Sequence, residues 1–96
     1  MLTSKQRAKL RGIASTYETI FQVGKNGIGE QMVQQVKDAL KKRELVKIHV
    51  LENAEYDAKE AASILAEETK SEVVQVIGSR FVLYKRNPQD PVIDLK

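Results

Sequence analysis

Residues 20–36, IFQVGKNGIGEQMVQQV, change from an apolar strand pattern to a helical pattern across a short turn. Gly24 and Gly27 bracket two polar residues, so the turn has the form Gly-x-x-Gly. Glycine has no Cβ atom, which lets a ligand approach the backbone closely. A helix that starts after such a turn directs unpaired N–H groups and the positive end of its dipole toward the turn. The sequence therefore predicts a site for an anionic group, with Lys25 adding a positive charge at the tip.

Helix and strand signals alternate on both sides of this turn. Thr3 with Gln6, and Asp57 with Glu60, have the spacing of capping boxes, so each pair predicts the start of a helix. Gly78 and its neighbours separate two β-branched runs, which is typical of a hairpin. The predicted elements are a helix from residue 3, a strand at 20–23, a helix at 28–43, a strand at 45–51, a helix from residue 57, and strands at 73–77 and 81–84.

This order predicts an α/β fold of the α+β two-layer type, αβαβαββ, around a mixed four-stranded sheet. Strand–helix–strand repeats favour parallel pairing with right-handed crossovers, and the final hairpin should add an antiparallel edge. Residues 1–86 should form a single domain. Residues 87–96 contain two prolines and little periodicity, so we expect an extended or flexible tail.

Composition excludes several classes of protein. The 96 residues include no cysteine, which excludes disulfides, a thiolate nucleophile and Cys-ligated zinc. No segment approaches the roughly 20 apolar residues of a membrane span. We expect a cytoplasmic protein that acts as a monomer and makes no contact with a membrane.

Charge is unevenly distributed along the chain. Residues 1–51 contain ten Lys/Arg and four Asp/Glu, whereas residues 52–72 contain two and seven. The basic excess surrounds the glycine turn, and a local basic patch is the expected footprint of a polyanionic partner.

Catalytic signals are missing from this pattern. His49 is the only histidine and lies beside Lys47 in a predicted strand. No carboxylate lies at a sequence spacing from it that is typical of a catalytic or metal-binding pair. The glycine turn matches neither a dinucleotide fingerprint nor a Walker A loop. We therefore expect no enzyme, no catalytic residue, no metal, no cofactor and no small-molecule substrate.

Four motifs in the same order resemble the CRM domain (chloroplast RNA splicing and ribosome maturation), in its stand-alone bacterial, YhbY-like form. The resemblance covers residues 2–86, and the motifs that carry it are Leu2–Arg7 with Leu10-Arg11, Gln22–Ile28, Ala39-Leu40 with Glu44–Ile48, and Val74–Gly78 with Val82–Lys85. One departure is Gly29, where family members often have a threonine that could cap the helix. Glycine is an acceptable N-cap, and it costs only a few tenths of a kcal/mol.

The resemblance implies a non-enzymatic RNA-binding protein that binds ribosomal RNA in precursors of the large subunit and assists ribosome assembly. It also implies a fold like the C-terminal domain of translation initiation factor three. The family's GxxG loop maps onto Gly24, Lys25, Asn26 and Gly27, and its basic first helix onto Lys5, Arg7, Lys9 and Arg11.

Two questions remain open at this stage. Lys5 and Lys9 lie on one flank of the first helix and Arg7 and Arg11 on the other, so only one pair can easily face the same RNA. Weaker candidate contacts are Arg80, Lys85 and Arg86. The alternative functions are a KH-like binder of single-stranded messenger or small RNA, which also uses a GxxG loop, and a protein-interaction module.

Overall fold

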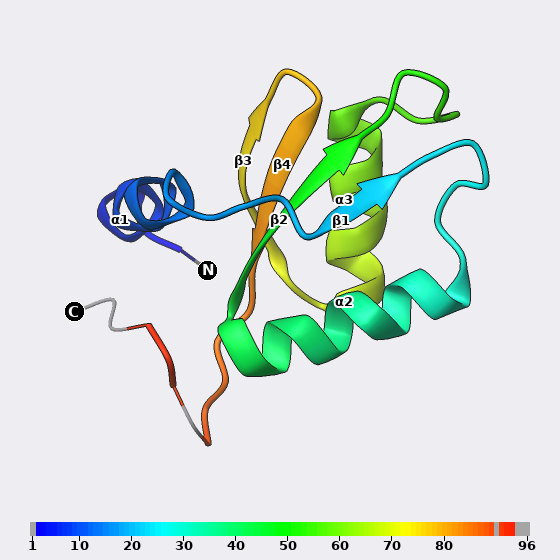
Figure 1. The fold of residues 1–96 in the computed structure, drawn as a ribbon. Helices are drawn as coiled ribbons and strands as arrows, with labels where there is room; N and C mark the ends of the chain where they lie inside the picture. Colours follow the sequence, from blue (N-terminus) through cyan, green and yellow to red (C-terminus); the bar gives the residue numbers. More distant parts are fainter. Residues whose placement is uncertain (1, 90, 94–96) are drawn as a thin grey trace.

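A computed structural model describes residues 2–89 and 91–93, and Figure 1 shows it as a ribbon. Residue 1 and residues 90 and 94–96 of the predicted tail lie outside the described residues. The elements are α1 (Ser4–Ala14), β1 (Phe21–Val23), α2 (Glu30–Arg43), β2 (Leu45–Val50), α3 (Ala58–Thr69), β3 (Glu72–Ile77) and β4 (Arg80–Tyr84). This order confirms the predicted α+β fold with a mixed four-stranded sheet.

The strands lie in the order β1-β2-β4-β3, with β1 and β2 parallel and the other two pairs antiparallel. The final hairpin therefore adds an antiparallel edge, as predicted, with β3 as the edge strand and β4 inserted between β2 and β3. The physical reason is burial: all four residues from Phe81 to Tyr84 are buried. A strand buried on both faces belongs inside a sheet. By contrast, Ile77 of the edge strand β3 is 62% exposed.

Local capping sets where the helices begin. Both predicted capping boxes are confirmed: Thr3 and Gln6 exchange hydrogen bonds at the start of α1, and Asp57 and Glu60 do so at the start of α3. Helix α2 begins at Glu30, two residues later than predicted, because residues 28 and 29 remain outside the helix. Within the described part of the chain, no helix is long and apolar enough to cross a membrane.

Helices pack on both faces of the sheet. Helices α2 and α3 share one core cluster with Val46, Ile48 and Phe81, while α1 packs against Val74 and Val82 on the opposite face. Figure 1 shows α1 to the left of the sheet, on the side of β3 and away from β1. Because α1 is short and displaced, part of this second face stays open.

Glu44 closes the other end of α2. It is fully buried and left-handed (φ 62°), and its N–H donates to the Leu40 carbonyl at 2.8 Å. Its carboxylate accepts backbone N–H bonds from Asn87, Val92 and Ile93, each at 2.6 Å. Burial raises the pKa of Glu44, but the three donors and the positive charge of Arg86 outweigh it, so the net pKa is lowered. This carboxylate fixes the segment that follows β4 against α2.

Candidate nucleic-acid interface

The glycine turn is an exposed loop between β1 and α2. The Gly27 N–H donates to the Gly24 carbonyl at 3.0 Å, and Lys25 and Asn26 between them are exposed. Gly27 has φ +72°, a left-handed conformation that favours glycine. Gly24 differs, since its φ is ordinary and an added Cβ would lie 3.5 Å from Leu51 Cδ1, a normal contact. The fold thus requires glycine at position 27 but not at position 24.

The helix that follows the loop has an open N-terminus. Gly29 is its N-cap, and no side chain among the described residues accepts a hydrogen bond from the first-turn amides. An added Cβ at Gly29 would meet nothing within 4 Å. Unpaired N–H groups at a helix start attract anions, although the exposed Glu30 carboxylate lies in the same turn.

An acidic loop borders the glycine turn on one side. A Cβ at Gly27 would lie 3.7 Å from Tyr56 Cε2, and Tyr56 belongs to the loop that joins β2 to α3. This loop carries Glu52, Glu55 and Asp57, which line a hollow shared with the β3–β4 turn. A polyanion is repelled from this side, so the face that carries α1 is the electrostatically favourable approach.

The predicted basic residues of α1 have different surroundings. Lys5, Lys9 and Arg11 are exposed. Arg7 is half-buried, and its Nη1 donates to the carbonyl of Val73 and, at 3.3 Å, to that of Val74. The flank that carries Arg7 and Arg11 therefore faces β3, and Arg7 holds α1 on the sheet.

Arg80 lies at the same end of the sheet as the glycine turn. The strand register places Gln22, His49, Arg80 and Ile77 side by side in one row across all four strands. With about 4.8 Å between neighbouring strands, this cross-strand row spans about 14 Å. Its first member, Gln22, lies two residues before Gly24, so the row runs from the glycine turn across the open face.

Lys85 and Arg86 lie at the opposite end of the sheet. Lys85 Nζ donates to the Thr69 carbonyl at 3.1 Å. Lys85 and Arg86 line a hollow together with Lys37 and Lys41 of α2. The structure thus brings Arg80 toward the predicted loop and separates Lys85 and Arg86 from it.

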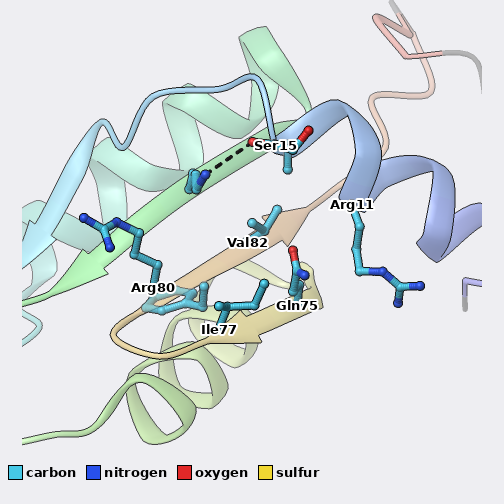
Figure 2. Close-up of a pocket in the computed structure, with 9 residues that line it drawn as sticks. Arg11, Ser15, Gln75, Ile77, Arg80 and Val82 are labelled. Atoms are coloured by element: carbon cyan, nitrogen blue, oxygen red, sulfur yellow. Dashed lines mark hydrogen bonds between the residues drawn. The ribbon is translucent and has the colours of Figure 1, made fainter.

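Sequence reasoning missed part of the open face. Lys47, Gln75 and Ile77 gather with Arg11 and Arg80 around a hollow beside the end of α1, which Figure 2 shows. For Lys47, the sequence signal is the alternation along β2, which places it on the face opposite Val46 and Ile48. Gln75 carried none, because a bulge between Val73 and Gln75 shifts the register of β3. In the described residues, no group of three His, Asp or Glu residues could hold a metal ion.

The family profile of the CRS1/YhbY (CRM) domain matches residues 2–85, so the chain belongs to this family. It is 43% identical over 95 residues to the "Probable RNA-binding protein YqeI" of Bacillus subtilis, covering 99% of both chains. It is 33% identical to an "RNA-binding protein" of Haemophilus influenzae, over 88% of this chain and 85% of the other. A solution structure from Staphylococcus aureus, described as "a putative RNA binding protein", matches over 100% of both chains with 49% identity and a TM-score of 0.81.

Proposed function

We propose that this protein binds RNA without catalysing a reaction, and that its target is ribosomal RNA in precursors of the large subunit, whose assembly it assists in the cytoplasm as a monomer. The observation that carries the proposal is the exposed glycine turn, with Lys25 at its tip and an uncapped helix behind it. The fold does not itself require glycine at position 24. Close approach of a ligand backbone accounts for a glycine there. The relatives that are named RNA-binding proteins support RNA as that ligand.

In this proposal, the amides of the turn and of the first turn of α2 hold backbone phosphates. Lys25 and the exposed cations of α1 (Lys5, Lys9 and Arg11) broaden the contact, together with Arg80. Arg7 orients α1 through its hydrogen bonds to β3, so its guanidinium is not free to contact RNA. Lys85 and Arg86 supply a secondary contact at the far end of the sheet.

A charge reversal at the loop tests the phosphate contact. Lys25→Glu should weaken binding to a folded fragment of large-subunit ribosomal RNA about tenfold, equivalent to about 1.4 kcal/mol. The plot of log K against log salt should lose about one unit of slope, because one phosphate contact disappears. Circular dichroism should show an unchanged fold, since Lys25 is exposed.

Lys42→Glu is the matched control, with the same charge change at the far end of α2. It should weaken binding much less. An equal loss of RNA affinity in the two variants would show that binding responds to net charge alone. That result would refute a binding site at the glycine turn.

The identity of the RNA needs a separate measurement. Crosslinking in cells, followed by sequencing of the attached RNA, should recover large-subunit ribosomal RNA. Recovery of messenger or small RNA, with tighter binding to short single strands than to folded ribosomal RNA, would favour the KH-like alternative.

A further inference from the structure

The hollow beside α1 has an apolar floor and a cationic rim. Its volume is about 290 Å³, and it lies between the end of α1 and the β3–β4 hairpin. Ala14 and Val82 form buried parts of its lining, at 1% and 3% exposure. Figure 2 shows Arg11 and Arg80 on opposite sides of it, with Gln75 and Ile77 between them.

The electrostatics of this hollow favour an anionic occupant. Arg11, Lys47 and Arg80 line it, and none of the lining residues is acidic. Among the described residues, the Lys47 ammonium donates one hydrogen bond, to the Ala14 carbonyl at 3.5 Å. Within residues 2–89 and 91–93, the guanidinium groups of Arg11 and Arg80 have no hydrogen bond or ion pair with the protein. These cations remain available to a ligand.

The other lining residues, Ile77 and Gln75, suit a planar nucleobase with hydrogen-bonding groups at its edge. Ile77 lines the hollow with 62% of its surface exposed, so it offers an apolar contact to a ligand. The side-chain amide of the half-buried Gln75 has no protein hydrogen-bond partner in the described part of the chain. An amide side chain of this kind can donate to and accept from a base edge, and guanidinium planes stack on bases.

The cross-strand row connects this hollow with the glycine turn. The row passes from Gln22 through His49 to Arg80 and Ile77, and the last two residues line the hollow. One RNA strand held at the turn can therefore continue over the face that the acidic loop leaves open.

We propose that this hollow accepts one unpaired nucleotide of the bound RNA, with the base against Ile77 and the Arg80 guanidinium, Gln75 at the base edge, and Arg11 and Lys47 near the phosphate. The proposal rests on RNA binding as proposed above and adds a requirement for an unstacked base. Protein recognition of RNA favours such bases, because paired bases in A-form RNA are hard to reach.

A fully paired RNA hairpin and four variants of it, each with one bulged nucleotide in the stem, test the proposal. Each of the four bases is placed in turn at the bulge, and affinities are measured in one buffer of fixed salt. The wild-type protein should bind at least one bulged hairpin about tenfold more tightly than the fully paired hairpin, as expected for one stacked base. Equal affinity for the paired hairpin and all four bulged hairpins would overturn the proposal.

Substitutions that leave the net charge unchanged then test which residues cause the preference for bulged RNA. Ile77→Ser and Gln75→Ala should each bring the affinity ratio of bulged to paired RNA close to one while leaving affinity for the paired hairpin unchanged. Val76→Ser is the matched control, since Val76 is the neighbouring residue on the other face of β3 and is 40% exposed. Its ratio should match the wild type. A ratio that survives in both Ile77→Ser and Gln75→Ala, or that falls equally in Val76→Ser, would overturn the proposal.

Lys25→Glu distinguishes a failure of the nucleotide-binding hollow from a failure of the phosphate-binding glycine turn. It should weaken binding to both hairpins and leave their ratio intact. If Lys25→Glu weakens both but no bulge preference exists, the hollow is not a nucleotide site and the loop proposal stands. If the bulge preference depends on Ile77 while Lys25→Glu has no effect, the loop proposal fails instead.

Discussion

Helix α2 starts at Glu30, and its N-cap, Gly29, offers no capping side chain. At the other end, the C-cap Glu44 has a carboxylate that accepts three backbone hydrogen bonds. The first end is exposed and its amides lack a side-chain acceptor; the second is buried and its polar atoms are paired. Both ends carry the partial charges of the helix dipole. Polar groups that the fold uses are buried with partners, whereas polar groups left at the surface without partners are available to a ligand. Substitutions at the two ends of α2 and in the glycine turn test this contrast.

Removal of the Glu44 carboxylate should have the largest effect. Glu44→Ala leaves the backbone N–H groups of Asn87, Val92 and Ile93 without their acceptor, which should lower the free energy of unfolding by about 3 kcal/mol. Urea denaturation measures this loss. Glu67→Ala removes an exposed carboxylate on α3 and should change stability by less than about 0.5 kcal/mol. A loss at Glu44 no greater than that at Glu67 would show that the buried bonds contribute little.

Acid should weaken the same contact. The pKa of Glu44 is lowered from its ordinary value of 4.5, so its contribution to stability is fully present above about pH 4.5 and is lost as the pH falls through the lowered value. The unfolding free energy of the wild type should therefore decline more steeply with acid than that of Glu44→Gln, whose amide does not titrate. Urea midpoints from neutral pH to about pH 3 would compare the two. Parallel declines would mean that other carboxyls carry the acid sensitivity.

The two glycines of the loop should respond differently to the same substitution. Gly27→Ala forces a side chain into the left-handed region and should cost about 1 kcal/mol of stability. Gly24→Ala should leave thermal stability nearly unchanged, because its Cβ makes only an ordinary contact, but it should weaken RNA binding. Equal destabilisation by the two substitutions would contradict the assignment of Gly24 to ligand approach.

A cap added to the open end of α2 should have the smallest effect. Gly29→Ser supplies a hydroxyl that can accept a hydrogen bond from the first turn, which should raise stability by a few tenths of a kcal/mol. Thermal denaturation would detect the gain. A decrease would indicate that the first-turn amides are already satisfied.

Local signals allowed much of the fold to be predicted from the sequence. Thr3 with Gln6, and Asp57 with Glu60, act within one helical turn, and both capping boxes occur where the spacing placed them. Apolar and polar residues alternate along β2, and this local pattern agrees with the burial of Val46 and Ile48 in the core. The position of β4 was not accessible in this way, because strand order depends on contacts between residues far apart in the chain.

The candidate site divides in the same way. The glycine turn is local and was identified from four consecutive residues. The role of Arg7 depends on carbonyl groups 66 and 67 positions away, and that of Glu44 on amides 43 to 49 positions away. In sequence, Glu44 follows three cations and is typical of a solvated helix end. Its buried role becomes visible only in three dimensions.

The contact between Arg7 and β3 also bears on how the sheet avoids pairing with a second molecule. Exposed strand edges are templates for aggregation unless they are short, irregular or covered. At one edge, β1 offers three residues; at the other, β3 is interrupted by a bulge, and two of its carbonyls near that bulge already accept bonds from a guanidinium. A side chain that docks a helix thus also shields the sheet from unwanted self-association.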